Sequence, residues 1–132
     1  MMRNKTRRVV IALAVDEYDN VLMGKRCDNK KYAQPAGKLY MKEDPYQGMK
    51  REFLEETGVD IEEIKLIGSE WDKDRNLILY LFKVVPVSQE FDVSKDPDGE
   101  FESLHYIDPN NIVEELHVPI EQNIALRYWM QN

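Results

Sequence analysis

The stretch "GKLYMKEDPYQGMKREFLEETGV", residues 37–59, decides the fold because it contains the most clearly marked helix of the chain. Asp44 has the side chain of an N-cap, Pro45 suits the first helical position, and Gly58 suits the residue that ends a helix. We therefore expect a helix over residues 45–57. Side chains at three- and four-residue steps should pack on a sheet, and these are Tyr46, Met49, Phe53 and Thr57.

The same helix carries three glutamates in an unfavourable place. Glu52, Glu55 and Glu56 share one face near the C-terminal end. There the helix dipole favours cations, and like charges three or four residues apart repel. Arg51 is the nearby counter-charge. A divalent cation would relieve the repulsion, because Mg²⁺ binds carboxylate oxygens together with water and substrate phosphate. The alternative is a solvated acidic helix face without a ligand.

Further fixed positions surround the three glutamates at regular spacing. Gly37 is followed by Glu43, then by Arg51 with the glutamates, and then by Gly58. This pattern resembles the signature box of the Nudix hydrolases at every fixed position. The expected order of strands and helices is also similar to the α/β/α sandwich with a mixed β-sheet of that family. We therefore expect one Nudix-type α/β domain over residues 1–132.

The resemblance implies a metal-dependent pyrophosphohydrolase that cleaves the diphosphate linkage of a small nucleotide, with Mg²⁺ or Mn²⁺ as cofactor. Arg51 and Glu43 would orient the carboxylates through hydrogen bonds. The catalytic set implied by similarity is Arg51, Glu52 and Glu55, and which glutamate is the general base stays open. For the downstream acid among the metal ligands, Glu102 is the alternative to Glu100. The ligands implied by similarity are Glu52, Glu55, Glu56, Glu100 and the backbone carbonyl of Ala36.

Residues near the start of the box are candidates for substrate binding. The cations among them would meet an anionic substrate, whereas a solvated strand end explains them about as well. A glycine at position 37 would let the loop approach metal or phosphate closely. Tyr32 could stack on a nucleobase, although aromatic residues at strand edges more commonly pack in the core. The candidates are Lys25, Arg26, Tyr32, Gly37 and Lys38.

The substrate stays open between two classes. "PAG", residues 35–37, resembles the corresponding stretch of several ADP-ribose pyrophosphatases, but the proline that often follows their box is missing. The longer stretch "GKRCDNKKYAQPAGK", residues 24–38, is similar instead to nucleoside triphosphate pyrophosphatases of the MutT kind. A catalytically silent nucleotide-binding or sensor module on the same fold is the alternative from a different functional class.

Composition limits the partners. The chain has 132 residues and a net charge of −7, which argues against binding to polymeric nucleic acid or to anionic membranes. No apolar stretch approaches the roughly 20 residues of a membrane span. Cys27 is the single cysteine, so an intrachain disulfide is excluded. We expect a cytoplasmic protein that acts on small molecules, with a homodimer possible.

The rest of the chain is expected to supply the sheet and a helical end. Residues 8–26 should form two neighbouring strands, and short strands are expected near Tyr32 and Leu39. His105 and His117 lack metal-ligand spacing and are assigned no chemistry. Residues 112–130 should be helical with a break near Pro119. Longer strands are expected at residues 64–71, 77–87 and 101–107.

Overall fold

The computed structural model describes residues 6–132, and its centre is a mixed four-stranded sheet in the order β4-β1-β6-β5. The strands are β1 (Arg7–Leu13), β4 (Ala36–Lys38), β5 (Ile61–Asp72) and β6 (Leu77–Pro86). Strands β1 and β6 are parallel, whereas β1–β4 and β5–β6 are antiparallel pairs. The prediction of a mixed sheet is therefore confirmed.

A second, antiparallel sheet has the order β3-β2-β7. It consists of β2 (Val21–Arg26), β3 (Tyr32–Ala33) and β7 (Phe101–Ile107). The expectation that the first two strands are neighbours is correct only where they join, at an isolated bridge between Val15 and Val21. Beyond that bridge β2 leaves the first sheet, because its hydrogen bonds go to β3 and β7.

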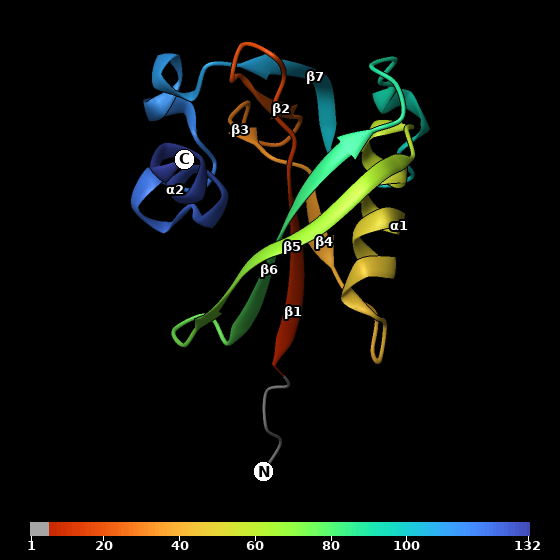
Figure 1. Cartoon of the computed structure of the whole chain (residues 1–132), viewed down its shortest axis with the longest axis vertical. Coiled ribbons are helices and arrows are strands. Elements are labelled where there is room, and N and C mark those ends of the chain that lie inside the picture. The colour runs from red at the N-terminus through yellow and green to blue at the C-terminus, as the bar shows by residue number, and fades with distance from the viewer. Residues whose placement is uncertain (1–5) are drawn as a thin grey trace.

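The two α-helices cover opposite faces of the four-stranded sheet (Figure 1). They are α1 (Pro45–Thr57) and α2 (Ile124–Gln131). Alternation along β1 supplies both faces, since Val10 packs in the cluster on the α1 side and Leu13 in the cluster on the α2 side. Burial of both clusters stabilises the sandwich and keeps the sheet between the helices.

Helix α1 begins and ends where its capping residues predict. The side chain of Asp44 accepts from the backbone N–H of Gln47 at 3.1 Å, and Gly58 ends the helix with a left-handed φ of 73°. Tyr46 is the least buried residue of the predicted face, at 41% exposure. It still packs on the sheet, since its ring meets Phe82 of β6 edge-on at 5.0 Å between centroids. The other three side chains of the predicted face are fully buried, and these are Met49, Phe53 and Thr57.

The prediction of helix over residues 112–130 holds for α-helix only at residues 124–130, and the predicted break near Pro119 is confirmed. Short 3₁₀ helices form instead, and α2 begins only after Asn123, whose side chain accepts from the N–H of Leu126 at 3.0 Å. Pro119 has no N–H to donate, so an α-helix cannot run through it. No helix within residues 6–132 is long and apolar enough to cross a membrane. The 3₁₀ helices are Val93–Lys95, Pro109–Asn111, Val113–Glu115 and Ile120–Gln122.

Candidate active site

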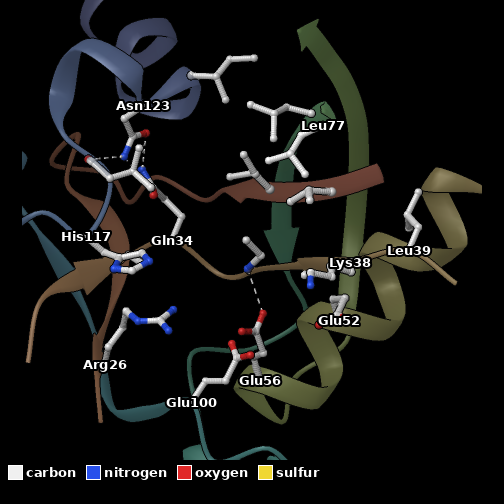
Figure 2. Close-up of a pocket in the computed structure, with 18 of the residues that line it drawn as sticks. Arg26, Gln34, Lys38, Leu39, Glu52, Glu56, Leu77, Glu100, His117 and Asn123 are labelled. Atoms are coloured by element: carbon white, nitrogen blue, oxygen red, sulfur yellow. Dashed lines mark hydrogen bonds between the residues drawn. The ribbon is translucent and has the colours of Figure 1, made fainter. Parts of the chain in front are cut away.

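A pocket of about 610 Å³ opens on the α2 side of the four-stranded sheet (Figure 2). Four acidic residues line it, two from α1 and two from the loop just before β7: Glu52, Glu56, Asp98 and Glu100. Its polar part is formed by Gln34, His117 and Asn123. Its apolar floor consists of Val9, Ile11, Leu77, Leu79 and Ile124. Acidic, apolar and amide surfaces therefore meet in one pocket.

The acidic side chains reach the pocket around the edge of the sheet. Gly37 on β4 pairs with Val10, which faces α1. A Cβ on residue 37 would overlap the carboxyl group of Glu52. Because glycine has no Cβ, the carboxylate can lie against the outer strand and line the pocket on the other side. The predicted close approach at Gly37 is thus an approach of a protein carboxylate.

Glu56 is the most deeply buried acid, at 2% exposure. Its Oε1 accepts from the backbone N–H of Ala36 at 2.9 Å, and Oε2 has no hydrogen-bond partner among residues 6–132. A buried oxygen without a partner is costly, and it is the kind of atom that a bound cation would satisfy. The donor set also fits a hard divalent cation, because it consists of carboxylate oxygens.

Crowding perturbs the protonation of these carboxylates. Burial raises the pKa of Glu52 to about 7, against the opposing effect of Arg51. Burial also raises the pKa of Glu56 well above its ordinary value, and the neighbouring Glu100 and Glu52 raise it further. Each group disfavours ionisation of the next. Without a cation, the cluster therefore retains protons that isolated carboxylates would lose.

Arg51 connects the acids of the helix. Its Nε and Nη2 donate to Glu43 at 2.8 and 2.9 Å, and its Nη1 donates to Glu52 at 2.9 Å and to Glu55 at 3.3 Å. The guanidinium also stacks on the ring of Tyr40, 3.8 Å from its centroid. These contacts offset much of the repulsion at the helix end, and the orienting role of Arg51 and Glu43 stays a prediction.

Two of the predicted substrate-binding cations line the pocket. Lys38 does so from β4, on the face of the sheet that carries Val9, its partner in the strand register. Arg26 does so from the end of β2, where its guanidinium binds Asp28 at 2.8 Å. Figure 2 shows Arg26 extending toward Glu100 and Glu56.

Other predicted site residues are not brought to the pocket. Lys25 lies 3.6 Å from the carboxylate of Glu102, which also accepts from Lys30 at 2.7 Å, so the alternative downstream acid is engaged elsewhere. Tyr32 packs against the apolar cluster on the α2 side. Glu55 turns toward Arg51 and does not line the pocket. Among residues 6–132, no group of three or more His, Cys, Asp or Glu side chains could hold a metal ion as it stands.

Sequence reasoning missed the polar end of the pocket. Gln34 donates to the side-chain oxygen of Asn123 at 3.1 Å, and both side chains are 6% exposed. Next to them, Nδ1 of His117 lies 3.0 Å from the amide nitrogen of Asn29. Burial and the nearby Arg26 lower the pKa of His117, so the neutral ring can accept this amide hydrogen. These residues lie far apart in the sequence, and only Asn123 carried a local signal, that of a helix cap.

Comparisons with known proteins agree with this architecture. The family model described as NUDIX domain matches residues 5–128. A MutT-like protein of Streptomyces ambofaciens is 32% identical over 77 residues, which are 58% of this chain and 50% of that protein. The 8-oxo-dGDP phosphatase NUDT18 of Mus musculus is 31% identical over 102 residues, 75% of this chain and 31% of that protein. The chain thus spans half or less of the length of these relatives.

Solved structures share the fold at lower identity. A NUDIX hydrolase from Nitrosomonas europaea has a TM-score of 0.74 and 23% identity, covering 96% of this chain and 87% of that one. The MutT protein from Methanosarcina mazei Go1 has a TM-score of 0.71 and 20% identity, covering 99% and 97% respectively. The family model spans nearly the whole chain and the fold agrees with it. The chain therefore belongs to the NUDIX domain family.

Proposed function

We propose that the protein is a hydrolase that depends on a divalent cation and cleaves a diphosphate linkage in a small nucleotide. The observation that carries the proposal is the unpartnered, buried Oε2 of Glu56 beside Glu52 and Glu100 in the pocket. Family membership supports the reaction class, as do the relatives called a MutT-like protein and an 8-oxo-dGDP phosphatase.

The acidic wall of the pocket would hold the cation, Mg²⁺ or Mn²⁺. Once bound there, the cation would neutralise diphosphate charge and lower the pKa of a coordinated water. We assign the ligand role to Glu52, Glu56 and Glu100. Further candidates are the backbone carbonyl of Ala36 and the carboxylate of Glu55. Glu52 already lines the pocket while one of its oxygens accepts from Arg51 at 2.9 Å.

The chain's own groups would prepare the substrate for attack. Arg26 and Lys38 are placed to bind phosphate oxygens, since both line the pocket beside the acids. Arg51 would keep Glu52 and Glu55 in position through the hydrogen bonds described above. The proton released by the attacking water would pass to a carboxylate oxygen of the glutamate cluster.

The polar end suits a nucleobase. The amides of Gln34 and Asn123 offer both donors and acceptors, and the adjoining floor is apolar. A volume of about 610 Å³ lies in the range of pockets for small ligands. Nucleoside triphosphates and ADP-ribose-like compounds both remain candidate substrates, and the name of one relative adds 8-oxo-dGDP. The net charge of −7 favours free nucleotides over polymeric nucleic acid.

A nucleotide panel with Mg²⁺ or Mn²⁺ tests the proposal by released phosphate and product masses. Glu52→Gln and Glu56→Gln should each abolish turnover while leaving the circular dichroism spectrum unchanged. Glu63→Gln is the matched control, because Glu63 is exposed on β5 and does not line the pocket. The alternative, a silent nucleotide-binding module, predicts binding without hydrolysis by any nucleotide of the panel. Undiminished turnover in both pocket variants would refute the glutamate roles.

A further inference from the structure

A third cation lines the pocket from the hairpin between β5 and β6. Arg75 belongs to the turn of this hairpin and is exposed, yet it lines the same pocket as the glutamate cluster. Its Nε lies 2.6 Å from Asp72 at the other side of the turn. Arg75 lies outside the box at residues 37–59, and the reaction chemistry above does not use it.

The strand register shows how far Arg75 lies from the other groups. Along β1, Arg7 is opposite Leu77, which follows the turn, and Ile11 is opposite Ala36. At about 3.3 Å per residue, these two positions are about 13 Å apart. Val9 lies between them, opposite Lys38. The turn that carries Arg75 and the acidic wall beside Ala36 therefore lie well apart along one strand.

Along the direction of β1, Gln34 and Asn123 lie beyond the glutamates that line the pocket. The N–H of Ala12 donates to the carbonyl of Pro35 at 2.9 Å, so Gln34 comes near the far end of β1. Hence Gln34 and Arg75 occupy opposite ends of the pocket, with the glutamates between them. Figure 2 shows Gln34 and Asn123 on one side of the pocket, Lys38 and Leu77 on the other, and Glu56 below both.

The backbone of the turn is fixed while the side chain of Arg75 is weakly held. The N–H of Arg7 donates to the backbone carbonyl of Asn76 at 3.1 Å, and the guanidinium of Arg7 donates to the backbone carbonyl of Arg75 at 3.3 Å. By contrast, the side chains of Arg75 and Asp72 are 48% and 24% exposed. Exposed ion pairs contribute little to stability, so Arg75 can exchange Asp72 for another anion at small cost.

We propose that Arg75 is a specificity-determining residue that binds an anionic group at the end of the substrate farthest from the Gln34–Asn123 pair. This inference rests on the proposed function. A guanidinium binds phosphate or carboxylate with two parallel hydrogen bonds, and Asp72 occupies that position until the ligand replaces it. Lys38, between Arg75 and the glutamates, supplies a second cation along the same path.

Substrates that differ at this end should therefore respond differently. The terminal phosphate of a nucleoside triphosphate can reach Arg75 as an anion, whereas ADP-ribose places an uncharged sugar on the far side of its diphosphate. Arg75→Gln should raise KM for ATP about tenfold, which corresponds to about 1.4 kcal/mol. The same variant should change KM for ADP-ribose less than about twofold.

The variant Asp72→Asn distinguishes a role of Arg75 in substrate binding from a role in the structure of the turn. Asparagine keeps the oxygen that accepts from the N–H of Arg75 at 3.0 Å but loses the charge that competes with substrate. It should lower KM for ATP about twofold. A structural role would make both variants act in the same direction. Lys73→Gln is the control for charge, since Lys73 is exposed in the same turn and does not line the pocket.

Binding measurements decide the inference even if neither nucleotide is hydrolysed. The ligand is Mg²⁺ with an ATP analogue in which methylene groups replace both bridging oxygens, and calorimetry measures its binding to the wild type and the three variants. Arg75→Gln should bind it most weakly, the wild type more tightly, and Asp72→Asn most tightly. Equal constants, or equal effects of Arg75→Gln and Lys73→Gln, would overturn it. Lack of hydrolysis with this order intact would overturn only the proposed function.

Discussion

The carboxyl group of Glu52 occupies the space in which a side chain at Gly37 would lie. This relationship joins two layers of the molecule, because Glu52 belongs to α1 while the pocket that it lines faces α2. The short outer strand β4 lies between them. A missing side chain at one sheet position therefore brings the helix carboxylates to the pocket.

Gly37→Ala should lower kcat/KM at least about tenfold and leave the fold intact. The added methyl group displaces the end of a flexible side chain and not backbone, so the melting temperature should change little. Gly68→Ala on β5 is the control, because a Cβ there meets its nearest neighbours at an ordinary 4.0 Å. Equal kinetics of the two variants would contradict the importance of this approach.

Stability without metal should fall as pH rises. Burial raises the pKa of Glu52 to about 7 and that of Glu56 well above its ordinary value. The folded state thus binds protons more tightly than the unfolded state, whose glutamates titrate near pH 4.5. The resulting stabilisation is complete below about pH 4.5 and is lost as pH rises through 7.

Melting temperatures between pH 5 and pH 8 in the presence of a chelator measure this effect. Glu52→Gln should flatten the dependence, since an amide does not titrate. Addition of Mg²⁺ should raise the melting temperature most at pH 8, where the carboxylates are ionised and can bind the cation. A melting temperature that rises with pH in chelator would contradict the prediction.

Glu56→Gln should stabilise the metal-free protein at pH 8 by about 1 kcal/mol. Glutamine keeps an oxygen for the N–H of Ala36 and removes the buried charge that repels Glu52 and Glu100. Denaturant unfolding in chelator gives the free energy of unfolding. Glu55→Gln is the matched control, because Glu55 is partly exposed and paired with Arg51. A clear loss of stability in Glu56→Gln would show that the ionised carboxylate is favourable where it lies.

Arg51→Lys should reduce both stability and turnover. Lysine keeps the charge but cannot reach Glu43 and Glu52 with separate nitrogens as the guanidinium does. We expect a loss of about 1–3 kcal/mol in the free energy of unfolding, together with a fall in kcat that exceeds the change in KM. Lys50→Gln, at the exposed neighbouring position, should leave both unchanged. Wild-type kcat in Arg51→Lys would exclude the orienting role.

Local signals in the sequence predicted α1 accurately. Asp44 and Gly58 mark its ends, and the spacing of the glutamates places them on one face. Tyr46 contacts the sheet through Phe82 as the pattern predicts, but it is 41% exposed, which the periodic pattern does not reveal. Pro119 signalled a break, but the pairing of the residues before it with β3, through Tyr32 and Leu116, had no local signal.

The amide end of the site could not be predicted from local patterns. Gln34 and Asn123 are 89 residues apart, and their contact depends on how α2 packs on the sheet. The same holds for Arg75, whose place at the pocket follows from the parallel pairing of β1 with β6. Sequence spacing identifies groups that one helix brings together, whereas groups from several elements converge only in the folded chain.

Asn123 belongs to two structures at once, because its side-chain oxygen accepts both from Gln34 and from the first turn of α2. Fraying of that turn would therefore open the pocket wall, and a ligand that orders the amide pair would in turn protect the backbone amides of the C-terminal helix from hydrogen exchange. Ligand binding in the pocket and the stability of helix α2 are in this way coupled.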